Sequence, residues 1–223
     1  MAAATIAPIA GENFPVKPPH MVEAVYPLFT AILAGRTEEV RQLLAAQVDI
    51  DERGGRHRSS ALHIAAANGK EELVLLLLER GADVSVQNNN GWTPLHGAAH
   101  QGREDNLRLL LEHAADPSVK GNDGRTALHA ACVMGRVGIV QLLLDGGADM
   151  QMRSNSGETP EDIATEQDHP QIAAMLQAEA VRREEMRRAQ CVAFAAGHHE
   201  RLGAGSRVQE LDAGVVRMVL EYV

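Results

Sequence analysis

The sequence has few aromatic residues and no long apolar run, although apolar residues are common in it. Aromatic side chains make up 3% of the 223 residues, whereas apolar residues as a whole make up 45%. A hydrophobic core in such a chain must come from alanine and leucine packed between small helices. No run approaches the ~20 apolar residues of a membrane span, so we expect no membrane association.

Excess positive charge and cysteine are also lacking. The formal net charge of −9 argues against a general nucleic-acid binder, which would need a basic surface. The two cysteines, Cys132 and Cys191, fit a reducing compartment, and Cys132 falls in a small column expected to be buried. We find no secretory leader pattern, and we therefore expect a cytoplasmic protein, with nuclear access as an alternative.

What the sequence does contain is an internal repeat. The strings SALH at 60–63, TPLH at 93–96 and TALH at 126–129 start 33 residues apart, and a degenerate copy, TPED, follows at 159–162. A weaker first copy, YPLF, occupies 26–29. A glycine stands nine residues after each of the three main starts, at Gly69, Gly102 and Gly135. A period of this length predicts a stacked solenoid.

Backbone chemistry explains the recurring residues. Thr93 suits a helix N-cap, and Pro94 suits the first helical position, where its missing N–H is not needed. Gly102 allows the positive φ of a turn between two helices. The dipeptides NG at 90–91 and DG at 123–124 favour a tight turn between repeats. Each unit is therefore predicted to be a turn, a short helix and a longer helix, buried only by stacking.

These motifs resemble the ankyrin repeat over about residues 22–180. The resemblance implies an all-α solenoid of stacked helix-turn-helix units with hairpin-like finger loops. The predicted repeats are 22–57 (N-terminal cap), 58–90, 91–123, 124–156 and 157–180 (C-terminal cap). Residues 1–21 are predicted to be a disordered arm, and residues 181–223 a helical extension, a Gly-rich loop and a terminal amphipathic helix, which resembles no family that we recognise.

Three residues depart from the repeat pattern. Arg58 replaces the glycine at the tip of the first finger, which is also longer and more basic than the others. Asn106 stands in a column that is apolar elsewhere, so it either faces outward or is a polar defect. Ala114 stands where the neighbouring repeats have glycine, and a positive φ there would cost about 1 kcal/mol relative to glycine.

The histidines of the three main repeats could be read as a metal site. One histidine per repeat, at His63, His96 and His129, gives a ladder with steps of about 8 to 10 Å. Zinc ligands must each lie within roughly 2.1 Å of the ion, so this ladder is too open. In the ankyrin family this histidine hydrogen-bonds within and between repeats. Residues 198–200 (His-His-Glu) lack a second ligand cluster and are predicted to be a solvated turn.

The resemblance implies a concave surface, formed by finger tips and first helices, that binds proteins. We place Trp92 and Arg125 first as binding anchors, because aromatic and arginine side chains dominate interface energetics. The alternative is that Trp92 braces the fingers. The predicted partner-binding positions are Gln87, Asn89, Trp92, His100, Gln101, Lys120, Asn122, Arg125, Val133, Met134, Arg153, Asn155 and Glu158.

A second interaction helix is predicted near the C-terminal end. Its apolar residues fall on one helical stripe. The stripe comprises Leu211, Val215, Met218, Val219 and Tyr222. We favour docking of this helix on the last repeat, and the alternative is a segment that enters a groove on another protein.

The sequence as a whole predicts a non-catalytic protein-interaction module or adaptor, monomeric alone, with a protein partner and without cofactor or metal. Residues 181–223 are too few for an independent catalytic core. One alternative is a nucleic-acid-associated factor that uses the basic finger at residues 53–58. Another is a regulatory subunit of an enzyme.

Overall fold

The computed structural model describes residues 25–202, and side chains within 27–191. This part of the chain forms ten α-helices and no β-strand. The helices are α1 (Val25–Ala34), α2 (Thr37–Ala45), α3 (Ala61–Ala67), α4 (Glu71–Glu79), α5 (Pro94–Gln101), α6 (Glu104–Glu112), α7 (Ala127–Val133), α8 (Val137–Asp145), α9 (Pro160–Glu166) and α10 (Pro170–Leu202).

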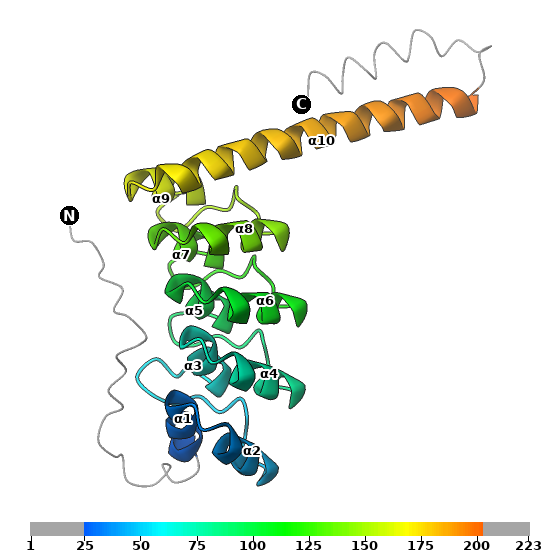
Figure 1. The fold of residues 1–223 in the computed structure, drawn as a ribbon. Coiled ribbons are helices and arrows are strands. Elements are labelled where there is room, and N and C mark those ends of the chain that lie inside the picture. Colours follow the sequence, from blue (N-terminus) through cyan, green and yellow to red (C-terminus); the bar gives the residue numbers. More distant parts are fainter. Residues whose placement is uncertain (1–24, 203–223) are drawn as a thin grey trace. The chain divides into compact units, whose positions relative to one another are not determined.

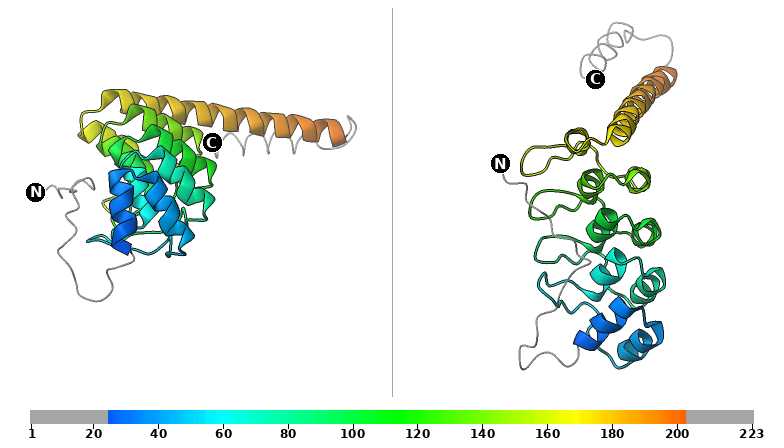
Figure 2. Two further views of the ribbon diagram at one scale, coloured as in Figure 1. Left: turned by 60° about the horizontal axis from the view of Figure 1, so that its bottom comes forward. Right: turned by 60° about the vertical axis from the view of Figure 1, so that its left-hand side comes forward.

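The first compact unit, which ends at Ala173, is a stack of helix pairs. The first helices α1, α3, α5, α7 and α9 pack on one another, and the second helices α2, α4, α6 and α8 form a second layer. Finger loops leave the stack beside the first helices, away from the second helices, as the right-hand view of Figure 2 shows. The predicted all-α ankyrin solenoid is confirmed.

The first helices α3, α5 and α7 begin with the same cap. Thr93 is the N-cap of α5 and Pro94 is its first residue, as predicted. Ser60 and Thr126 hold the same place before α3 and α7. In each case the cap residue and the histidine three positions later form a capping box, which satisfies amides that the helix itself leaves unpaired.

The turn from first to second helix needs glycine for two reasons. Gly102 has a φ of +72°, a conformation that costs a side chain about 1 kcal/mol. In addition, a Cβ on Gly102 would lie 3.0 Å from the Arg136 side chain of the next repeat. Gly69 lies in the same way beneath Arg103, whose Nε donates to the carbonyl oxygen of Ala67 at 3.2 Å. A cation therefore covers the end of each of these first helices, where the helix dipole favours positive charge.

The finger tips are closed by hydrogen bonds across four to five residues. In the second finger the amide of Asn88 donates to the carbonyl oxygen of Trp92, and the amide of Gly91 donates to that of Asn88. Gly91 has a φ of +72°. Arg58, the substitute for this glycine in the first finger, keeps a positive φ of +50°, and Gly54 and Ser59 form a single antiparallel bridge beside it.

The core consists mainly of leucine and alanine, as the low aromatic content predicts, with some isoleucine and valine. Leu62, Leu95 and Leu128 are 1% exposed or less in three successive first helices. Cys132 is fully buried, and burial raises the pKa of its thiol to about 12. The buried column predicted for Cys132 is therefore confirmed.

The two uncertain columns are resolved by the structure. Asn106 is 1% exposed, so it is a buried polar residue and does not face outward. Ala114 has a φ of +62°, beside +84° at Gly81 and +85° at Gly147. The positive φ expected at Ala114 is therefore present.

Helix α10 differs from the predicted C-terminal region. Only its residues up to Ala173 belong to the first compact unit, and the second unit begins at Ala174. The helix continues through Gly197 to Leu202, so residues 198–200 are helical and the solvated turn predicted for them is wrong. Arginine, glutamate and alanine, which favour helix, outweigh this single glycine.

Within the second unit, Glu179 receives hydrogen bonds from Arg182 and from Arg183, which places opposite charges at helical spacing. The predicted arm at 1–21 and the predicted terminal stripe lie outside the described residues, and the repeat boundaries stay a prediction. Within residues 25–202, no helix is both long and apolar enough to cross a membrane.

Candidate functional site

The candidate binding surface is the inner face, which we define as the finger loops together with the exposed side of the first helices (Figure 2). The predicted partner-binding positions fall into several groups on this face. Some of them hold neighbouring repeats together, and others leave their side chains in solvent.

The histidine ladder lies beneath the inner face and is structural. Nε2 of His63 lies 2.8 Å from the carbonyl oxygen of Trp92 in the next finger. Nε2 of His96 lies 3.2 Å from that of Arg125, and Nε2 of His129 lies 3.2 Å from that of Glu158. Each Nδ1 accepts a hydrogen bond from a cap residue's amide, so Nε2 carries the proton and donates it.

Burial keeps these histidines neutral. It lowers the pKa of His63 and of His96 from 6.5 to about 4, despite the carbonyl partners, which act in the opposite direction. Burial lowers the pKa of His129 as well. The hydrogen-bonding role expected from the resemblance is confirmed. Among the described residues, no group of three or more potential ligands is placed to hold a metal ion.

In the last repeat the same capping position holds an acidic residue. The amide and the hydroxyl of Thr159 donate to Asp162 at 2.9 and 2.8 Å. These hydrogen bonds lower the pKa of the Asp162 carboxyl. The carboxylate thus completes the cap without reaching toward a further repeat.

Trp92 is the more buried of the two predicted anchors, Trp92 and Arg125. Its side chain is 6% exposed, and its ring stacks on His96 with 5.9 Å between ring centroids. It also lies 5.5 Å from the ring of His100, which is 4% exposed. This arrangement favours the alternative that Trp92 braces the fingers. His100 is buried against Trp92 as well, so its side chain also packs within the stack.

The tip asparagines connect successive fingers. Nδ2 of Asn122 donates to the carbonyl oxygen of Asn89 at 2.7 Å, and Nδ2 of Asn155 donates to that of Asn122 at 2.8 Å. The tip glycines allow this approach, because a Cβ on Gly91 would lie 2.7 Å from the amide nitrogen of Asn122. These asparagines are exposed, but their amides are committed to the stack.

A second row of side chains runs along the fingers, and we call it the finger row: Arg53, Gln87, Lys120 and Arg153. Nη1 of Arg53 donates to the carbonyl oxygen of Gln87 at 3.0 Å. Nε2 of Gln87 donates to that of Lys120 at 3.2 Å, and Nζ of Lys120 donates to that of Arg153 at 2.8 Å. Nη1 of Arg153 ends the row on the carbonyl oxygen of Gly157 at 2.6 Å.

The sequence interpretation missed Arg53 as a member of this row. It grouped Arg53 with the basic finger at 53–58, because that finger is one residue longer than the others. The available signal was the periodicity, since the register places Arg53 in the column of Gln87, Lys120 and Arg153 once the extra residue is counted.

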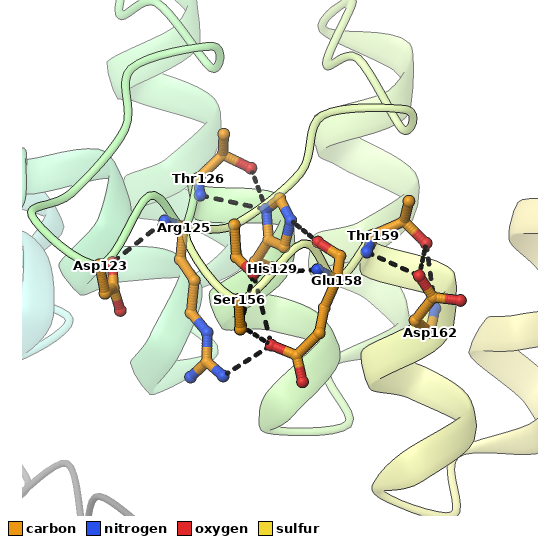
Figure 3. A network of polar contacts seen from close by, with 9 residues as sticks. Asp123, Arg125, Thr126, His129, Ser156, Glu158, Thr159 and Asp162 are labelled. Atoms are coloured by element: carbon orange, nitrogen blue, oxygen red, sulfur yellow. Dashed lines mark hydrogen bonds and ion pairs between the residues drawn. The ribbon is translucent and has the colours of Figure 1, made fainter.

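Arg125 and Glu158 join the third and fourth fingers. Nη2 of Arg125 lies 3.6 Å from Oε2 of Glu158, and both side chains are between a quarter and a third exposed. Glu158 also receives a hydrogen bond from Ser156, and its pKa is lowered mainly by that bond and further by Arg125. Figure 3 shows this network beside His129 and the Thr159–Asp162 cap. Arg125 is therefore engaged within the stack, although part of it reaches solvent.

The remaining predicted positions lie at the ends of α5 and α7. Gln101 and Val133 are partly exposed, and Met134 is 37% exposed. Leu33 holds the position of Val133 in the first repeat and is 41% exposed. These side chains give the inner face an apolar component. The predicted second interaction helix lies outside the described residues.

Comparison with known proteins agrees with this geometry. A family model described as ankyrin repeats (3 copies) matches residues 12–88, 28–121, 62–154 and 115–184. E3 ubiquitin-protein ligase HACE1 of Xenopus tropicalis is 42% identical over 73 residues, which is 32% of this chain and 8% of that protein. Human HACE1 is 40% identical over the same length.

Protein phosphatase 1 regulatory subunit 12A of mouse is 40% identical over 57 residues, which is 26% of this chain and 6% of that protein. The aligned segments thus cover less than a tenth of these relatives. The family model, by contrast, covers most of this chain. The chain belongs to the ankyrin-repeat family, whose stacked units serve as protein-interaction modules.

Proposed function

We propose that this protein is a non-catalytic adaptor whose inner face binds a protein partner. The observation that carries the proposal is the division of labour within each repeat. Columns such as the histidine ladder hold the stack, while other columns keep their side chains exposed in successive repeats. Exposed columns repeated along a stack form a continuous surface, on which a partner can span several repeats.

The chemistry of the exposed columns fits a protein interface. Met134 supplies exposed apolar area, Gln101 supplies an amide, and Lys120 supplies a charge. The three residues come from two neighbouring repeats. Interfaces combine an apolar centre with a polar rim in this way, and methionine adapts to irregular surfaces.

The terminal stripe at Leu211–Tyr222 stays a second proposed contact. Ending the chain at Glu210 would remove it and leave the repeats intact. Loss of a partner on that truncation alone would assign the partner to the stripe.

The test of the inner face uses two matched substitutions. Met134 is 37% exposed on the inner face, and Leu75 is 38% exposed on α4 in the layer of second helices. We expect Met134→Arg to remove specific partners from an affinity capture quantified by mass spectrometry, and Leu75→Arg to retain them. Both variants should keep the wild-type circular dichroism spectrum.

Equal retention of all partners by Met134→Arg and wild type would contradict the proposal. Trp92→Ala would be a poor test of binding, because Trp92 is buried and its removal would destabilise the stack itself.

A regulatory role toward an enzyme is the second candidate, because the mouse relative carries the name of a phosphatase regulatory subunit. It predicts that the partner lost on Met134→Arg is an enzyme whose rate changes when the purified chain is added. An unchanged rate at saturating chain would dismiss this candidate and leave the binding module.

A further inference from the structure

The finger row presents three exposed cations, of which Arg153 interacts at longer range with the Asp162 carboxylate. Arg53, Lys120 and Arg153 are exposed, and each donates to a neutral backbone carbonyl. None of the three forms an ion pair within 4 Å among the residues that the structure describes. A carbonyl fixes the position of a cation without cancelling its charge, so these charges remain available to a partner.

The same hydrogen bonds place the cations in advance. A free lysine or arginine loses considerable rotamer entropy when it becomes ordered on binding. Here the side chains already lie along the fingers, each held by the next one, so binding an anion requires less further ordering. Of the acidic side chains on the fingers, Glu158 is paired with Arg125 and Ser156, whereas Asp123 accepts only a neutral amide and keeps its charge.

The spacing of the cations selects an extended segment with separated charges. Neighbouring repeats lie about 8 to 10 Å apart, and an extended peptide advances about 3.3 Å per residue, so one repeat corresponds to about three residues. Gln87 interrupts the row between Arg53 and Lys120. Acidic side chains at the first, seventh and tenth positions of a peptide would meet the three cations.

A nucleic acid fits this surface less well than a peptide does. Its phosphates form a continuous line of charge. Exposed aspartates lie at the base of the fingers, at Asp83, Asp116 and Asp149, and would repel that line. A peptide can place neutral residues opposite these aspartates.

We propose that the finger row binds an extended acidic segment of the protein partner, with carboxylates spaced to meet Arg53, Lys120 and Arg153. This inference rests on the proposed function and adds the chemistry of the segment that is recognised. Gln87, the uncharged member of the finger row, shows that a neutral side chain can keep the hydrogen bond to the next finger.

The test measures fluorescence anisotropy of labelled synthetic 12-residue peptides at low salt. One peptide has glutamates at positions 1, 7 and 10 in a glycine–serine background, and a second has the same composition with adjacent glutamates. We expect the spaced peptide to bind more tightly. Arg53→Gln and Lys120→Gln should each weaken the affinity for the spaced peptide about two- to fivefold, as expected for loss of an exposed ion pair. Glutamine keeps an N–H donor for the hydrogen bond to the next finger.

Arg108→Gln, an equal change of charge on α6, should leave the affinity unchanged. Gln87→Lys should tighten a peptide that carries a fourth glutamate at position 4, which would lie opposite this residue. The inference is overturned if neither peptide binds, if the two bind equally, if Lys120→Gln has no effect, or if a 12-nucleotide single strand binds more tightly than the spaced peptide.

These outcomes are distinct from failure of the proposed function. Loss of partners on Met134→Arg together with no peptide binding would reject the acidic segment and keep the binding module. Retention of all partners on Met134→Arg would reject the inner face itself.

Discussion

Nδ2 of Asn106 lies 2.9 Å from the carbonyl oxygen of Ala66, which belongs to the preceding repeat. The same nitrogen donates to the carbonyl oxygen of Ala65 at 3.1 Å, while Oδ1 is buried and has no hydrogen-bond partner in the described structure. This asparagine stands where the adjacent repeats have Leu73 and Ile139, both buried. The polar residue therefore replaces apolar packing with a directed link between α6 and α3.

The direction of that link gives the first prediction. Asn106→Asp would turn a donor into an acceptor that faces two carbonyl oxygens, so we expect a loss of about 3 kcal/mol or more in the free energy of unfolding. Asn106→Leu has the same branching and removes the unpaired oxygen along with the two hydrogen bonds, so its effect should stay within about 1 kcal/mol. Urea unfolding at neutral pH measures both, and equal effects would contradict the donor role.

The second prediction concerns the positive φ of Ala114. We expect Ala114→Gly to stabilise the protein by about 1 kcal/mol, which corresponds to a rise of about 2 to 4 °C in Tm for a domain of this size. The mirror change, Gly81→Ala, should lower Tm by a similar amount, since a Cβ at Gly81 would touch nothing within 4 Å and only the backbone conformation is affected. A differential scanning measurement in which Ala114→Gly leaves Tm unchanged or lowers it would count against this account.

The third prediction is a dependence of stability on pH through the histidine ladder. The folded-state pKa values of His63 and His96, about 4, lie below the ordinary value of 6.5, and that of His129 is lowered too. The unfolded chain therefore binds more protons as the pH falls below about 6.5, and stability that is complete above that pH is lost toward pH 4. His63 and His96 each contribute up to about 1.4 kcal/mol per pH unit inside this window, and His129 contributes in the same direction.

Urea unfolding at pH 7.5, 6.0 and 5.0 tests this expectation. From His63 and His96 we expect a loss of about 1 to 2 kcal/mol between pH 7.5 and 6.0 and a further loss of about 2 to 3 kcal/mol between pH 6.0 and 5.0, and the lowered pKa of His129 adds to both. A free energy of unfolding that does not change with pH would mean that the histidines of the ladder bind protons in the folded protein as readily as in the unfolded chain.

The fourth prediction separates the two thiols. Cys132 is fully buried with its pKa raised to about 12, whereas Cys191 is partly exposed on α10. An aromatic disulfide reagent at pH 8 should therefore modify one thiol rapidly and the second only at the rate of unfolding. Cys191→Ser should abolish the fast phase, and two fast phases in the wild type would show that the core around Cys132 opens.

Sequence and structure agree where a residue's effect is local. The cap at Thr93–Pro94 and the φ of Gly102 follow from backbone chemistry within a few residues, and both are found as predicted. The period of 33 residues extends this local information to the whole stack, because every unit repeats the same solution. This explains why the all-α solenoid was predictable without any knowledge of contacts.

The binding surface was less predictable because a variable position does not reveal what its side chain contacts. Trp92 is a residue type that often anchors interfaces, yet here it is buried against His96 and His100. Asn122 was placed among the binding positions, yet its amide links two fingers, and asparagine recurs in its column at 89, 122 and 155. Period and residue type cannot separate a solvent-facing side chain from one that bonds the next repeat, since both lie in the same columns.

The amino-acid sequence by itself determined the repeat unit, its turns and the order of the stack, because helix caps, glycine conformations and apolar spacing act over a few residues. Only the tertiary structure decided that Asn106 is buried and that Arg53, Gln87, Lys120 and Arg153 form one row. Those relationships join residues more than thirty positions apart, and they arise when one repeat packs on the next.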